Sequence, residues 1–123
     1  MYVLLIEDDL DIRSAIAALL RRKNYQVEEV STAKAAIDKI QSIRFDVVIA
    51  DQRLPGKATG LEVLAHHNQV SREGVRILLT GFFSDELTTV CREIDALYVQ
   101  KPIPPSQLVA KIEKLVHRSS SNG

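Results

Sequence analysis

Short apolar runs alternate five times with longer segments of helical spacing along this chain. The first run, Tyr2 to Ile6, is apolar at every position, which is typical of a strand that is buried on both faces of a sheet. In the segment that follows, Ile12, Ile16 and Leu20 recur at helical spacing. Regular alternation of strands and helices predicts a parallel sheet with helices on both faces. The expected strands are residues 2–6, 25–30, 45–50, 75–79 and 96–100, and the expected helices begin near residues 11, 33, 60, 85 and 105.

Five strands in one parallel sheet predict an α/β fold of the doubly wound, flavodoxin-like (βα)5 type, for which the common strand order is 2-1-3-4-5. The chain has 123 residues, which is the size of one compact domain. We place this domain at residues 1–118. Residues 119–123 are small and polar, and we expect them to form a flexible tail or the stub of a linker.

Composition argues against several classes of function. Acidic and basic residues balance at 16 each, so the chain has no excess of positive charge to attract nucleic acid or an anionic membrane. No apolar run is long enough to span a bilayer, and the N-terminus lacks the pattern of a secretory signal. The single cysteine, Cys91, cannot form an internal disulfide, and the adjacent His66 and His67 lack zinc-ligand spacing. A cytoplasmic location is therefore the default expectation.

Polar side chains follow four of the five expected strands. They are Glu7 and Asp8 after the first strand, Asp51 after the third, Thr80 after the fourth and Lys101 after the fifth. Taken singly, each has an ordinary explanation, since carboxylates cap helices, threonine favours strands and lysine is usually at the surface. In the expected strand order, however, the carboxyl ends of these strands meet at one edge, near the point where the order reverses. The sequence therefore predicts a binding site at this edge.

The clustering of these acids has an energetic consequence. Two carboxylates about 4 Å apart repel each other by about 4 kcal/mol at an effective dielectric constant near 20. A site that gathers Glu7, Asp8 and Asp51 therefore needs positive charge, from Lys101 and from a divalent cation. Oxygen ligands without histidine or cysteine suit Mg²⁺, which also shares phosphate oxygens. A metal, a cationic side chain and a carboxylate nucleophile are the parts that phosphoryl transfer uses.

The full set of residues at this edge is Glu7-Asp8, Asp51, Thr80 and Lys101-Pro102. It resembles the signature of response-regulator receiver domains of two-component signalling, of the chemotaxis-receiver type. The similarity extends from Tyr2 to about His117 and includes the loop 51–56 and the start of the third helix at 59–63. It implies Mg²⁺-dependent phosphoryl transfer to Asp51 from a histidine kinase or a histidine phosphotransfer protein. A domain of this kind stands alone or forms part of a hybrid sensor kinase.

The resemblance also implies a role for each residue of the set. Asp51 would be the phosphoacceptor. Mg²⁺ would be held directly by Asp8, Asp51 and the backbone carbonyl of Arg53, and through a water molecule by Glu7. Lys101 would pair with the phosphoryl oxygens and offset their charge.

A conformational switch is a further implication of the resemblance. Thr80 would hydrogen-bond the new phosphoryl group, and Tyr98 would rotate inward when Thr80 moves. The face made by the fourth helix, the fifth strand and the last helix would then change shape and bind a partner or a second copy of the domain. Tyr98 has an alternative as a half-buried tyrosine that packs on the last helices, and the sequence favours neither. Asp9 has no role in the family and is expected beside the cap of the first helix.

Several positions depart from the commonest family pattern. Glu7 stands where aspartate is more frequent, and Gly81 follows the threonine where alanine is common. Arg53 and Phe82 would flank the mouth of the site, and we expect their bulk to slow the access of water to an acyl phosphate. The resemblance also suggests a cis Lys101–Pro102 peptide bond, which is otherwise the minority state before proline.

Three alternatives belong to other classes of function. A phosphatase of the aspartyl-phosphate type would carry a second aspartate where this chain has Arg53, so a turnover enzyme is not expected. A flavin-binding module shares the fold, but the three acids after the first strand would repel a phosphate that lacks a metal. A binding module with an inactive site is disfavoured, because Asp8, Asp51 and Lys101 are all present.

Overall fold

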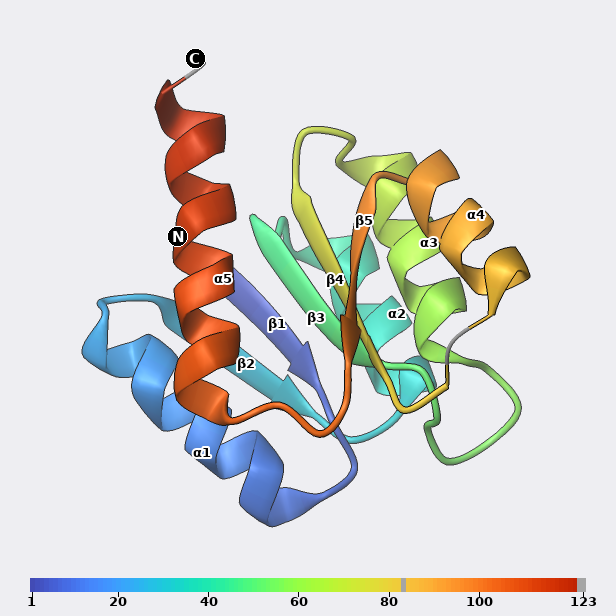
Figure 1. The fold of residues 1–123 in the computed structure, drawn as a ribbon, viewed down its shortest axis with the longest axis horizontal. Helices are drawn as coiled ribbons and strands as arrows, with labels where there is room; N and C mark the ends of the chain where they lie inside the picture. The colour runs from blue at the N-terminus through green and yellow to red at the C-terminus, as the bar shows by residue number, and fades with distance from the viewer. Residues whose placement is uncertain (83, 122–123) are drawn as a thin grey trace.

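The computed structural model describes residues 1–82 and 84–121, with side chains as far as His117. Within these residues, five parallel strands form one sheet in the order β2-β1-β3-β4-β5, and five helices cover its two faces (Figure 1). This is the doubly wound, flavodoxin-like α/β fold that the sequence predicts. The strands are β1 Tyr2–Ile6, β2 Gln26–Val30, β3 Val47–Asp51, β4 Val75–Thr80 and β5 Ala96–Gln100. The helices are α1 Leu10–Arg22, α2 Ala33–Ser42, α3 Gly60–Val70, α4 Asp85–Glu93 and α5 Pro105–Ser121.

Each face of the sheet has its own hydrophobic core. On one face, Leu20 of α1 and Ile112 of α5 belong to one buried cluster together with Leu5 of β1. On the other face, α2, α3 and α4 enclose a second cluster, to which Leu64 of α3 and Leu4 of β1 belong. Successive residues of β1 thus serve opposite cores, which explains why the sequence of this strand is apolar throughout.

Side-chain caps begin the first four helices. The caps are Asp9, Thr32, Thr59 and Ser84, and each accepts a hydrogen bond from the backbone N–H three residues later. Asp9, which was expected beside the cap of the first helix, is the cap itself. Within the part of the chain that the structure describes, no helix has the length and apolar character needed to cross a bilayer.

The structure differs from the expected boundaries mainly at the ends of elements. Asp51 and Thr80 are the last residues of β3 and β4 rather than the residues after them, because both still occupy positions in the ladder. β3 begins at Val47 rather than at residue 45. The last helix runs to Ser121, into the segment expected as a tail, while residues 122–123 lie outside the described part. The domain boundary near residue 118 stays a prediction.

A buried arginine occupies the end of β4 that lies away from the predicted site. Arg76 is only 1% exposed, and its guanidinium donates to the backbone carbonyl oxygens of Ser71 (2.9 Å), Arg72 (3.0 Å) and Ile94 (2.8 Å). Ser71 and Ile94 are the C-cap residues of α3 and α4. Because the last carbonyl groups of a helix carry partial negative charge, they stabilise this cation. Arg76 therefore ties the ends of two helices to β4.

His67 of α3 completes this buried cluster. Its Nε2 lies 2.9 Å from the carbonyl oxygen of Phe45, and its Nδ1 lies 3.2 Å from Nη1 of Arg76. A carbonyl only accepts and a guanidinium only donates, so the ring is neutral with its proton on Nε2. Burial lowers the pKa of His67 below its ordinary value of 6.5, the bond to Phe45 opposes this shift, and the charge of Arg76 adds to it.

The buried histidine predicts a loss of stability in mild acid. The unfolded chain binds a proton at His67 near pH 6.5, whereas the folded chain binds it only at lower pH. Above pH 6.5 the effect is absent, and below it the free energy of unfolding should fall by up to about 1.4 kcal/mol per pH unit. We expect His67→Gln to reduce this slope in urea unfolding between pH 7.5 and 5.5. His66→Gln, at the exposed neighbouring position, should keep the wild-type slope. Equal slopes in all three proteins would contradict the assignment.

Candidate functional site

The predicted residues meet at the carboxyl edge of the sheet. Glu7 and Asp8 follow β1, and Asp51 ends β3, which pairs directly with β1. Thr80 ends β4, and Lys101 follows β5. Since β1 lies between β2 and β3, the strand order reverses at this point. The side chains therefore lie where open parallel sheets place their ligands.

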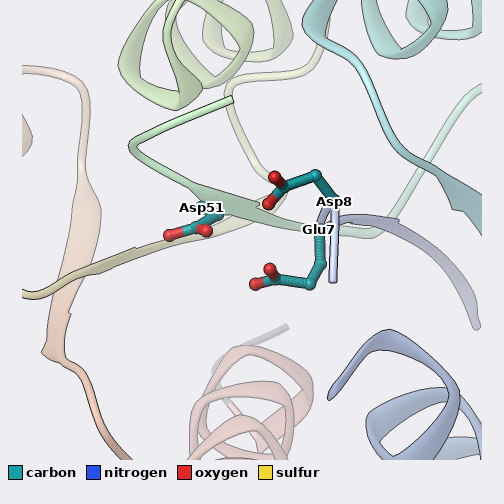
Figure 2. Close-up of side chains that lie close together, drawn as sticks. All are labelled: Glu7, Asp8 and Asp51. Atoms are coloured by element: carbon teal, nitrogen blue, oxygen red, sulfur yellow. The ribbon is translucent and has the colours of Figure 1, made fainter. Parts of the chain in front are cut away.

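The side chains of Glu7, Asp8 and Asp51 lie close together, and those of Glu7 and Asp8 extend toward Asp51 (Figure 2). One oxygen atom from each of Glu7, Asp8 and Asp51 lies within 4.8 Å of the other two. Glu7 is 1% exposed and Asp51 is 6% exposed, whereas Asp8 is exposed, so the cluster opens to solvent on the side of Asp8. Such a set of oxygen donors could hold a divalent cation of the Mg²⁺ type.

Lys101 supplies positive charge inside this cluster. Its Nζ donates to Oδ2 of Asp51 at 3.1 Å and to Oε2 of Glu7 at 3.2 Å. Burial alone would lower the pKa of Lys101, but the hydrogen bonds and charges of Asp51 and Glu7 outweigh it and raise the pKa. Burial raises the pKa of Glu7, as does the charge of Asp51, while hydrogen bonds from Asp9 N–H and Lys101 oppose the rise. The peptide bond between Lys101 and Pro102 is cis.

A cavity of about 260 Å³ opens beside the phosphoacceptor candidate Asp51. The guanidinium of Arg53 lies 4.3 Å from the centre of the Phe82 ring, which is a cation–π contact. Phe82 is 61% exposed, so this contact lies at the surface of the protein. The cavity is lined by Asp51, Arg53, Thr80, Gly81, Phe82 and Lys101.

Thr80 and Tyr98 share one hydrogen-bond acceptor. The hydroxyl of Thr80 accepts from the N–H of Phe82 at 3.1 Å and donates to its carbonyl oxygen at 3.3 Å. The hydroxyl of Tyr98 donates to the same carbonyl oxygen. The ring of Tyr98 is half-buried and packs against the hydrophobic cluster under α2, α3 and α4. Tyr98 thus has the packing of its structural alternative and also reaches the loop that follows Thr80.

Two residues that the pattern of the sequence did not single out, Gln52 and Gly60, shape the backbone next to Asp51. The N–H of Gly60 donates to the carbonyl oxygen of Gln52 at 3.2 Å, and the side-chain oxygen of Gln52 accepts from the N–H of Leu61 at 2.9 Å. A Cβ atom at position 60 would lie 2.2 Å from the carbonyl oxygen of Asp51, so only glycine fits there. One signal was present, because glycine directly after the cap Thr59 is a poor choice for helix stability alone.

Comparison with known proteins identifies the family. The family model described as Response regulator receiver domain matches residues 3–113. The chain belongs to this family of receiver domains. The sequence-based identification is confirmed, and with it the class of function, since receiver domains are signalling modules of two-component systems rather than turnover enzymes.

Two curated relatives of this receiver domain are named as transcriptional regulatory proteins. It is 26% identical over 121 residues to the phosphate regulon transcriptional regulatory protein PhoB of Escherichia coli. It is 33% identical over 130 residues to the transcriptional regulatory protein CutR of Streptomyces coelicolor. These alignments cover 96% and 98% of this chain but only 52% and 55% of the relatives. The chain therefore spans about half the length of the curated relatives it matches.

Solved structures of single receiver domains match over almost the whole chain. A CheY-like response regulator receiver domain protein from Methanospirillum hungatei superposes with a TM-score of 0.89 at 27% identity, covering 99% of this chain and 98% of that one. The chemotaxis protein CheY4 of Vibrio cholerae gives a TM-score of 0.80 at 28% identity, with coverage of 92% and 96%. The similarity is thus to the complete fold of these domains.

Proposed function

We propose that this receiver domain accepts a phosphoryl group on Asp51 from the phosphohistidine of a histidine kinase or a histidine phosphotransfer protein. The observation that carries the proposal is the contact of Lys101 with both Asp51 and Glu7, beside a cavity that Asp51 lines. A carboxylate that contacts a cation and borders open space can receive an anionic group. Preorganised positive charge of this kind is what phosphoryl transfer requires.

Mg²⁺ fits the acidic cluster by charge and by donor type. Three carboxylates against one ammonium leave an excess of negative charge, and carboxylate and carbonyl oxygens are the ligands Mg²⁺ prefers. In our proposal Asp8, Asp51 and the backbone carbonyl of Arg53 hold the ion directly, and Glu7 acts through a water molecule. When bound, Mg²⁺ supplies positive charge to the phosphoryl oxygens.

The carboxylate of Asp51 is the nucleophile in this proposal. One of its oxygens attacks phosphorus in line with the bond to the partner's histidine nitrogen. The oxygen–phosphorus bond forms as the phosphorus–nitrogen bond breaks, and the electron pair of the broken bond stays on the imidazole. Lys101 transfers a hydrogen bond from the carboxylate to a phosphoryl oxygen and so offsets the charge of the group as it arrives.

The output face in this proposal is made by α4, β5 and α5. Thr80 exchanges its bond to the carbonyl of Phe82 for a bond to the phosphoryl group, and Tyr98, which donates to the same carbonyl, then changes position. Leu97 on β5 is 36% exposed and lies on this face, where an apolar side chain suits contact with protein. The altered face would bind a partner protein or a second copy of the domain to form a homodimer.

We also propose that the domain acts in the cytoplasm through protein partners. Its 16 acidic and 16 basic residues balance, so it has no general attraction for nucleic acid or an anionic membrane. Residues 1–118 would form the receiver domain, and 119–123 a tail or linker stub.

The direct test of this function is phosphorylation by a small phosphodonor. We expect incubation with MgCl₂ and acetyl phosphate to add one phosphoryl group, measured by intact mass spectrometry. Asp51→Asn should abolish the gain, and removal of Mg²⁺ with EDTA should prevent it. Asp9→Asn, which replaces a neighbouring acid with an equally good helix cap, should leave the gain intact. Phosphorylation that persists in Asp51→Asn would contradict the assignment.

The contact between Arg53 and Phe82 predicts the lifetime of the phosphorylated form. Because both side chains line the cavity beside Asp51, they should hinder the approach of water to an acyl phosphate. We expect Arg53→Ala and Phe82→Ala each to speed loss of the phosphoryl group about two- to fivefold. This factor corresponds to the free energy of a cation–π contact at an exposed site. The double variant should add little, since each single change already breaks the contact. Lys57→Ala, exposed in the same loop, is the control, and lifetimes equal to that control would rule out shielding.

A further inference from the structure

Arg13 contacts the acidic site from outside the cluster of carboxylates. It lies on α1, its side chain is 18% exposed, and its Nη1 donates to the backbone carbonyl oxygen of Glu7 at 2.9 Å. That carbonyl belongs to the peptide unit that joins Glu7 to Asp8. The orientation of this peptide unit determines the directions in which the two side chains leave the backbone. Arg13 therefore acts on the geometry of two of the three acids through the peptide unit that they share.

Arg13 is itself held in place by the edge strand β2. Its Nε lies 3.4 Å from Oε1 of Glu29, whose other oxygen accepts from Nη1 of Arg21 at 2.9 Å. Arg21 also donates to the carbonyl oxygen of Val27 at 2.9 Å. The guanidinium of Arg13 thus bridges the end of β1 and the side of β2 with two different nitrogen atoms. A planar fork can hold both partners at once, which the single ammonium of lysine cannot do in the same way.

We propose that Arg13 is a positioning residue for cation binding: it fixes the Glu7–Asp8 peptide so that both carboxylates face Asp51. The inference rests on the proposed function, because it assumes that the cluster binds Mg²⁺. Mg²⁺ requires near-ideal ligand geometry, whereas Ca²⁺ tolerates flexible sites. Loss of an outer partner that orients a ligand typically weakens metal binding by about 10- to 100-fold.

The charge of Arg13 and its geometry have opposite effects on a bound cation. If only charge matters, removal of a positive group beside an acidic site favours cation binding, so Arg13→Gln would bind Mg²⁺ more tightly. If Arg13 orients the peptide, the same substitution binds Mg²⁺ more weakly. Arg13→Lys keeps the charge and most of the side chain, so charge alone predicts no change whereas positioning predicts weaker binding.

The test is calorimetric titration of the whole chain with MgCl₂ and, separately, with CaCl₂. We expect Arg13→Gln and Arg13→Lys to weaken Mg²⁺ binding about tenfold, and to weaken Ca²⁺ binding less. Arg21→Gln is the matched control. Arg21 lies on the same helix as Arg13 and also contacts Glu29, but it does not contact Glu7. This variant should bind Mg²⁺ like the wild type. Thermal unfolding of each variant in EDTA checks that it is folded. If Arg13→Gln does not fold, Arg13→Lys still tests the inference.

The outcomes separate the inference from the function on which it rests. Weaker Mg²⁺ binding in the Arg13 variants, with wild-type binding in Arg21→Gln, supports positioning. Binding that is unchanged or tighter in the Arg13 variants overturns positioning and leaves the proposed function standing. A wild-type chain that does not bind Mg²⁺ overturns both.

Discussion

Repulsion among Glu7, Asp8 and Asp51 is the constraint on which the rest of this site depends. The register of the sheet pairs Ile6 with Ala50, so the residues that follow them emerge side by side at the spacing of adjacent strands. Ionised carboxylates whose oxygen atoms lie within 4.8 Å repel each other by about 3.5 kcal/mol or more at an effective dielectric constant near 20. Lys101 offsets part of this repulsion through its two contacts. The remainder is what makes the cluster receptive to a divalent cation.

The two ends of the sheet have different tasks. At the carboxyl edge, Gly60 allows α3 to approach the backbone of Asp51, which fixes the carboxylate that receives the phosphoryl group in our proposal. At the opposite edge, Arg76 holds the last carbonyl groups of α3 and α4. Helix α4 is therefore anchored at Ile94, while its other end follows the loop of Thr80. In our proposal, a change at Thr80 moves the start of α4 more than its end, as in a switch that works by a small displacement.

The sequence was sufficient to predict the fold and the meeting of the site residues. Uninterrupted apolar runs identified the strands, and polar residues at their ends indicated one shared edge. The sequence was not sufficient to predict that Arg76 is buried. A single arginine inside an apolar strand looks like an exposed position unless the carbonyl groups around it are known. The close approach of Gly60 to Asp51 and the contact of Arg13 with Glu7 each join a residue at the end of a strand to the helix that follows, across a loop. Spacing along the chain carries no information about such distances.

The melting temperature of Asp51→Asn tests the central claim, that the three carboxylates are crowded into one pocket, most directly. In EDTA, removal of one negative charge should relieve repulsion and raise the melting temperature by roughly 2–5 °C, as expected for about 1 kcal/mol in a domain of this size. Asp38→Asn, which changes an exposed acid on α2, should leave it unchanged. Added Mg²⁺ should stabilise the wild type more than Asp51→Asn and so reduce the difference. A melting temperature in EDTA that is unchanged or lower for Asp51→Asn would contradict the account.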